Sequence, residues 1–141
     1  MREHLVNLAL KLVGCPYIWG GANPWTGFDC SGFVVWVYQV FGLLPSGDWT
    51  AQALVGWFLH RNEKANQNPQ PGEMVFYGPD PQHLTHVMLA LGGGFVVGAS
   101  GGGHEMTSTE EARRRGAQVK VKPIGYRSDL QFALGPGFPE E

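Results

Sequence analysis

The stretch GCPYIWGGANPWTGFDCSGFVVWVY, residues 14–38, carries most of the information about fold and chemistry in this chain. Residues 14–29 are rich in glycine and also hold aromatic side chains, so they predict a loop with tight turns that packs against the protein. From Cys30 to Phe41 nearly every residue is apolar, which fits either a helix buried on most sides or a strand. The length of about twelve residues favours the helix, which Gly42 would end.

Two further helices are predicted on either side of this stretch. Before it, apolar residues recur at helical spacing and form one stripe, and Gly14 and Pro16 would end the helix. The stripe consists of Leu5, Leu8, Ala9, Leu12 and Val13. After it, residues 50–60 carry apolar side chains on one face and predict another helix.

The second half of the chain shows strand patterns. Apolar runs at residues 73–77, 86–91 and 95–99 predict strands, and the glycines between the last two runs predict a hairpin turn. Residues 107–116 predict a short helix, and residues 119–122 alternate apolar and charged side chains as a half-exposed strand does. Because helices precede strands, we expect an α+β domain with N-terminal helices packed on a C-terminal antiparallel sheet.

The composition fits one domain over residues 1–141, with 43% hydrophobic residues. A formal net charge of -2 leaves no basic surface of the kind that binds nucleic acid. No apolar run approaches the roughly 20 residues of a membrane span. Asn7 and Lys11 interrupt the apolar N-terminal segment and no small-residue cleavage site follows, so we expect no signal peptide.

The two cysteines are expected to be thiols, because so few cysteines without a secretion signal do not build a disulfide scaffold. The chain has no C-x-x-C pair and no clustered histidines, so we expect no metal site and no cofactor. Cys15 is expected to be a buried thiol that packs under the glycine-rich loop.

Cys30 lies where the glycine-rich loop meets the predicted helix. The partial positive charge and the N–H groups of a helix start favour thiolate over thiol, which would lower the pKa of Cys30. The same N–H groups would stabilise an oxyanion formed when the sulfur attacks a carbonyl. Cys30 is therefore a candidate nucleophile, and a small buried apolar residue is the alternative interpretation.

A cysteine nucleophile needs a base that is close in space. His86 begins the apolar run 86–91, so it would lie at a strand end that faces the core or a cleft. His4 and His60 fall at predicted helix ends and His83 lies in a polar loop, where we expect solvent exposure. His86 is therefore the candidate base, and a structural histidine is the alternative.

Residues 14–38 closely resemble the nucleophile motif of the NlpC family, papain-like cysteine peptidases of bacterial cell-wall peptides. That motif contains Pro-Tyr, Trp-Gly-Gly and, at a helix start, Asp-Cys-Ser-Gly, which match residues 16–17, 19–21 and 29–32. The segment PGEMVFYGPDPQHLTHVMLALGGGFVVGAS, residues 71–100, resembles the paired strands of the family, with the catalytic histidine opening the second strand.

The resemblance implies a papain-like fold in which Cys30 is the nucleophile and His86 the general base. Together they would hydrolyse an amide bond in peptidoglycan stem peptides through an acyl-enzyme. It also implies that Tyr17 approaches the cysteine, where its phenol bonds the oxyanion or the substrate. Asp29 and Ser31 match family positions that help to hold the substrate peptide, often by its free amino terminus, and a carboxylate suits an ammonium group.

One position departs from the family pattern. The family has a third polar residue, commonly histidine, on the strand after the base strand, and the matching residue here is Gly98. The third residue orients the imidazole through its second nitrogen. Ser100, a backbone carbonyl or His104 is left for that role. We favour the first two, because three glycines before His104 make it costly to position.

The cellular context stays open. The compact build and the glycine-rich run 98–102 resemble phage-type members, which implies a phage lysin or tail-associated hydrolase with phage particle proteins as partners. An enzyme exported by another route and a cytoplasmic recycling peptidase are the other contexts. Gly98 also leaves open a decayed triad in a wall-peptide-binding or phage structural module. A third alternative keeps the Cys–His chemistry but uses another acyl substrate, such as a muramoyl-alanine amide or a lipid ester.

Overall fold

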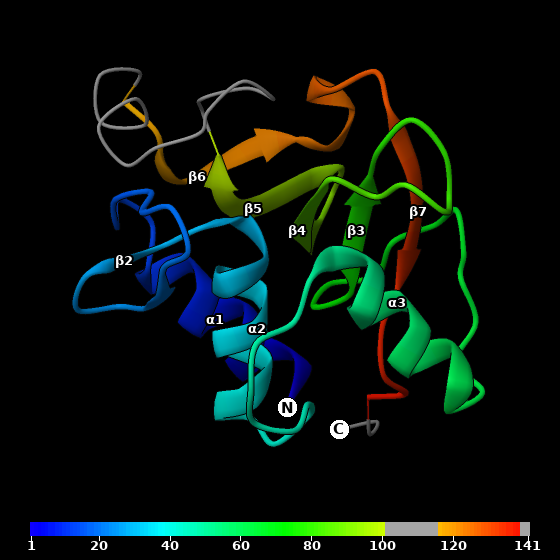
Figure 1. The fold of residues 1–141 in the computed structure, drawn as a ribbon. Helices are drawn as coiled ribbons and strands as arrows, with labels where there is room; N and C mark the ends of the chain where they lie inside the picture. Colours follow the sequence, from blue (N-terminus) through cyan, green and yellow to red (C-terminus); the bar gives the residue numbers. More distant parts are fainter. Residues whose placement is uncertain (101–115, 139–141) are drawn as a thin grey trace.

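The computed structural model describes residues 1–100 and 116–138 of the chain. The α-helices among these residues are α1 (Arg2–Lys11), α2 (Cys30–Val40) and α3 (Ala51–His60), and they precede the main sheet in the chain (Figure 1). Each coincides with a helix that the sequence predicts, which confirms those predictions. Within the described ranges, no helix is long and apolar enough to cross a membrane. The short helix expected over 107–116 lies outside the described residues, except for Gly116.

The main sheet consists of β3 (Met74–Tyr77), β4 (His86–Gly92), β5 (Phe95–Ser100), β6 (Gln118–Pro123) and β7 (Leu130–Leu134). Its strand order is β6-β5-β4-β3-β7, and every neighbouring pair is antiparallel. The predicted β4–β5 hairpin and the α+β arrangement are thus confirmed. β7 is an edge strand that the sequence analysis did not anticipate. A smaller sheet pairs β1 (Ala22–Asn23) with β2 (Gly27–Phe28) inside the glycine-rich loop.

The apolar run after Cys30 forms the helix α2, and several other elements cover it. α2 packs against β4 and β5 of the main sheet, against α1, and against the β1–β2 hairpin (Figure 1). Phe33, Val34, Val37 and Tyr38 are fully buried as a result. A helix enclosed in this way has apolar residues all round, which explains why its pattern could also be read as a strand.

The stripe predicted on the first helix holds only in part. Leu5 and Ala9 of α1 are fully buried, and Leu12 directly after the helix is nearly so. Val13 lies beyond the end of α1 and is 44% exposed, because the chain turns away from the core there.

Alternating side chains give the sheet two different faces. The face toward the helices carries Phe76, Val87 and Leu89 into the main core. The opposite face carries a smaller cluster that includes Tyr77 and Met88. The one-turn helix η1 (Ile124–Tyr126) packs on this second cluster through Ile124 and Tyr126. The second face is therefore covered where β4 begins.

Candidate active site

Cys30 is the first residue of α2, and its position is set by the capping residue Asp29. An Asp29 carboxylate oxygen accepts a hydrogen bond from the backbone N–H of Gly32 at 2.7 Å, which satisfies one unpaired donor of the helix start. A side chain at position 32 would collide with the carbonyl oxygen of Gly21, so glycine is required for the loop to approach the helix this closely. The Asp-Cys-Ser-Gly sequence thus builds both the cap and the close packing around the cysteine.

The fold brings Cys30 to the start of β4. The backbone groups of Val87 and Ser31 lie close enough to the Cys30 thiol to lower its pKa. Val87 directly follows His86, the first residue of β4. The nucleophile and base expected from the sequence therefore come from the start of a helix and the start of a strand that pack together.

The pKa of Cys30 is raised, although a position at a helix start would by itself lower it. Burial and, to a smaller extent, the neighbouring Asp29 carboxylate raise the pKa of the Cys30 thiol to about 11. The backbone groups of Val87 and Ser31 and the charge of Arg127 lower the pKa by less than burial raises it. The prediction of a lowered pKa is therefore wrong, because the cost of burying a thiolate exceeds the benefit of the helix start.

Tyr17 approaches the cysteine from the glycine-rich loop. Its phenol lies close to the backbone of Cys30, and burial together with the charges of Cys30 and Asp29 raises the pKa of the phenol. The backbone around Tyr17 is held by a hydrogen bond from its N–H to the carbonyl of Ala117 at 3.1 Å. Tyr17 also forms a bridge with Phe28 of β2. The phenol is therefore positioned beside the helix start by the fold.

Asp29 and Ser31 flank Cys30 and border a cavity of about 330 Å³. The Ser31 hydroxyl donates a long hydrogen bond of 3.5 Å to the Asp29 carboxylate. Burial raises the pKa of Asp29, and the nearby carboxylate of Asp48 adds to the shift. Asp48 and Trp49 also line the cavity. The cavity is acidic and lies next to the cysteine, so it suits a positively charged group on a bound molecule.

His86 is 6% exposed, and its ring nitrogen Nε2 lies 2.8 Å from the phenolic oxygen of Tyr126. The same phenolic oxygen lies 3.2 Å from the hydroxyl oxygen of Ser100 at the end of β5. Ser100, a residue considered for the third position, therefore reaches the imidazole through Tyr126. His104, the other side chain considered, lies outside the described residues.

Gly98, which the sequence analysis matches to the family's third polar residue, is tightly surrounded. A Cβ at position 98 would lie 2.6 Å from the sulfur of Met88, a distance that real Cβ atoms essentially never show. Met88 is fully buried on the same face of the sheet as Tyr77. Met88 on the neighbouring strand thus fills the space next to Gly98.

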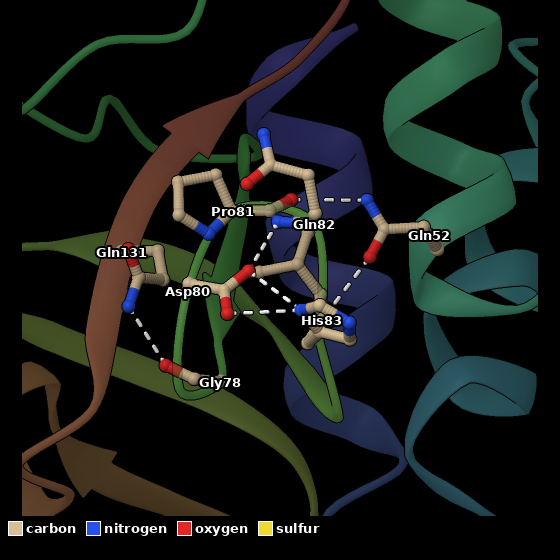
Figure 2. A network of polar contacts seen from close by, with 8 residues as sticks. Gln52, Gly78, Asp80, Pro81, Gln82, His83 and Gln131 are labelled. Carbon is tan, nitrogen blue, oxygen red and sulfur yellow. Dashed lines mark hydrogen bonds and ion pairs between the residues drawn. The ribbon is translucent and has the colours of Figure 1, made fainter.

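His83, the nearest competitor of His86 in the sequence, lies away from Cys30 in the loop between β3 and β4. Its ring is exposed and pairs with Asp80 at 2.8 Å (Figure 2). Gln52 of α3 holds this loop, because its side chain donates to the carbonyl of Pro81 and accepts from the backbone N–H of Leu84, both at 3.0 Å. These contacts fix the chain that leads into His86.

Tyr126 and Arg127 are site residues that the sequence analysis missed. Arg127 pairs with Asp129 at 2.6 Å, and its positive charge lowers the pKa of Cys30. Both residues lie at or just after the one-turn helix η1, which has no periodic pattern. No sequence signal marked them, because the proximity of Tyr126 to His86 and of Arg127 to Cys30 arises only in the folded structure.

Among residues 1–100 and 116–138, no group of three or more His, Cys, Asp or Glu side chains is arranged to hold a metal ion. Both cysteines are thiols. The chemistry that these residues support is nucleophilic attack by sulfur with proton transfer to a buried imidazole.

Comparisons with known proteins agree with this arrangement. The model of the NlpC/P60 family matches residues 14–122. The chain is 38% identical over 104 residues to the bifunctional muramidase/DL-endopeptidase CwlT of Bacillus subtilis, a match covering 72% of this chain and 30% of that protein. It is 39% identical over 101 residues to a probable endopeptidase of Mycobacterium tuberculosis, covering 70% of this chain and 23% of that protein. The chain thus spans less than a third of either relative.

The fold matches solved structures of the same family. The crystal structure of the NlpC/p60 domain of the peptidoglycan hydrolase SagA superposes with a TM-score of 0.71 at 31% sequence identity, over 96% of this chain and 99% of that one. This match confirms the papain-like fold expected from the sequence. The family match, the identity to named endopeptidases and the shared fold together place this chain in the NlpC/P60 family.

Proposed function

We propose that this domain is a cysteine peptidase that hydrolyses an amide bond in peptidoglycan stem peptides, with Cys30 as nucleophile and His86 as general base. The observation that carries the proposal is the packing of α2, which begins at Cys30, against β4, which begins at His86. Family membership and relatives named as endopeptidases support the substrate class. The name of the Bacillus relative, a DL-endopeptidase, supports a bond between a D- and an L-residue.

The reaction begins with transfer of the thiol proton to the imidazole. Because burial raises the pKa of Cys30 to about 11, the thiolate forms together with the imidazolium as the sulfur attacks the carbonyl carbon. The carbonyl oxygen becomes an oxyanion next to the helix start and the phenol of Tyr17, which can donate its proton in a hydrogen bond.

Collapse of this intermediate breaks the C–N bond. The imidazolium of His86 gives its proton to the departing amine, and the acyl group stays on the sulfur as a thioester. Water then attacks the thioester while His86 takes its proton, and the proton returns to the sulfur as the acid leaves. The net reaction is the addition of one water across the amide bond.

The cavity beside the cysteine places the substrate. Its carboxylates, Asp29 and Asp48, would bind the free amino terminus of a stem peptide, and Ser31 adds a hydroxyl at the same edge. An origin in a phage and partners in a phage particle stay predictions from the resemblance of the sequence to phage-type members.

Digestion of purified peptidoglycan tests the proposal. We expect soluble muropeptides whose masses locate the cut inside the stem peptide, and no products with Cys30→Ser. Products cut between muramic acid and alanine would favour the amidase alternative. Unchanged peptidoglycan that still retains the protein in a pull-down would favour a binding module, the alternative raised by Gly98.

A further inference from the structure

We propose that Tyr126 is the positioning residue of the catalytic imidazole, and that Ser100 sets the direction of its hydroxyl. This inference rests on the proposed function of Cys30 and His86. Its evidence is a chain of two hydrogen bonds, from His86 Nε2 to the Tyr126 oxygen at 2.8 Å and from that oxygen to the Ser100 hydroxyl at 3.2 Å. Tyr126 thereby takes the role that a side chain at Gly98 would have in the family.

The direction of the Tyr126 hydroxyl determines which nitrogen of the His86 imidazole carries the proton. A phenol has one proton, and a neutral imidazole carries one N–H. When the Tyr126 proton points to Ser100, the lone pair of the phenol faces Nε2, which must then carry the imidazole proton. Nδ1 of His86 is left with a lone pair and can take the thiol proton. The opposite direction would place the imidazole proton on Nδ1 and prevent it from acting as a base.

The hydrogen bond also fits the charged state of the reaction. After Nδ1 takes the thiol proton, Nε2–H still donates to the phenolic oxygen, so no group has to move. Burial raises the pKa of Tyr126, so the phenol keeps its own proton throughout. Tyr126 therefore orients the ring and fixes its tautomer without exchanging a proton with it.

Packing holds Tyr126 in this position. Its ring meets the Tyr77 ring edge-on at 5.7 Å, and the Tyr77 ring also lies 5.6 Å from the His86 ring. The Tyr77 hydroxyl donates to the carbonyl of Ile124 at 2.8 Å, and the Ile124 N–H donates to the carbonyl of Gly94 at 2.8 Å. η1 is thus held to β3 and to the turn between β4 and β5.

The residues around Gly98 explain why Tyr126 of η1, and not a residue of β5, positions the imidazole. A Cβ at position 98 would lie 2.6 Å from the Met88 sulfur, so a larger side chain there would require Met88 to move. Met88 belongs to the same buried cluster that Tyr126 packs against. Glycine at 98, methionine at 88 and tyrosine at 126 therefore form one consistent arrangement.

Tyr126→Phe is the main test, because it removes the hydroxyl and keeps the ring. We expect kcat to fall by about 10- to 100-fold, the range for losing a hydrogen bond to a charged group, with KM nearly unchanged. The pH profile of Cys30 alkylation by iodoacetamide should also shift, and this readout does not require hydrolysis. Ser100→Ala should move both quantities in the same direction by less.

Tyr77→Phe is the matched control. It also removes a phenol hydroxyl with a 2.8 Å hydrogen bond in the same cluster, but that hydroxyl bonds a backbone carbonyl. We expect a lower melting temperature with the wild-type alkylation profile. Restoring a family-type histidine with Gly98→His and Met88→Ala in the Tyr126→Phe background should recover part of kcat.

The two proposals fail in different ways. Wild-type kcat and alkylation profile in Tyr126→Phe would overturn the role of Tyr126, while loss of activity in Cys30→Ser and His86→Ala would leave the proposed function standing. If the wild-type protein cuts no peptidoglycan, the proposed function fails, and a shifted alkylation profile in Tyr126→Phe would still support the positioning role. Equal shifts in Tyr77→Phe and Tyr126→Phe would reduce Tyr126 to a packing residue and overturn the inference.

Discussion

Gly98 of β5 faces Met88 of β4 so closely that a Cβ on the glycine would lie 2.6 Å from the methionine sulfur. The two strands are adjacent in the sheet, and Met88 is fully buried. The sequence analysis matches Gly98 to the position of the family's third polar residue, and in the structure Met88 packs against that position. This contact lies on the face of the sheet that points away from the helices, where Met88 and Tyr77 belong to one buried cluster.

This contact predicts the effect of Gly98→Ala. The added methyl group overpacks the cluster, so the free energy of unfolding should fall by about 1–3 kcal/mol. In a Met88→Ala background the same substitution should cost much less, since the sulfur is gone. Chemical denaturation of the four proteins of this double-mutant cycle measures the coupling. Equal costs of Gly98→Ala in both backgrounds would contradict the proposed clash.

The raised pKa of Cys30 predicts that its reactivity depends on His86. With a thiol pKa of about 11, a thiol without its base forms very little thiolate at neutral pH. His86→Ala should therefore slow iodoacetamide alkylation of Cys30 at pH 7, and the rate should rise steadily up to about pH 11. Mass spectrometry of the labelled peptides separates Cys30 from Cys15, which serves as the internal reference. Wild-type alkylation rates in His86→Ala would show that the imidazole does not assist the thiol.

His86 and His83 give a matched pair of histidine substitutions. His86→Ala should reduce turnover of peptidoglycan by several orders of magnitude, because base and nucleophile act as a unit. His83→Ala should change turnover little, since His83 is exposed and pairs with Asp80 in the loop held by Gln52. Release of soluble muropeptides over time provides the measurement. If His83→Ala abolished turnover and His86→Ala changed it little, the assignment of His86 as the base would be wrong.

Asp29→Asn separates the two tasks of this residue. Asparagine caps a helix about as well as aspartate, so the hydrogen bond to Gly32 and the fold should persist. Loss of the charge should weaken the use of peptides with a free amino terminus by about 1.5–3 kcal/mol, the size of a hydrogen bond to a charged group. The rate ratio between free and N-acetylated stem peptides reports this loss. An unchanged ratio would limit Asp29 to capping the helix.

Local patterns in the sequence were sufficient for most of the elements. The apolar stripe of α1, the apolar face of α3 and the alternation in β6 each depend on a few neighbouring residues, so propensity and spacing predict them. The same holds for Cys30, because Asp29, Ser31 and Gly32 build the helix start around it by local contacts.

The partners of the two reactive residues depended on tertiary contacts. Tyr126 reaches His86 only because η1 packs on the second face of the sheet, and nothing in the local sequence encodes that docking. The pKa of Cys30 likewise depends on burial by elements far away in the chain, which outweighs the local effect of the helix start. The candidate nucleophile could thus be identified from the sequence, whereas its protonation and the surroundings of the proposed base depend on the folded core.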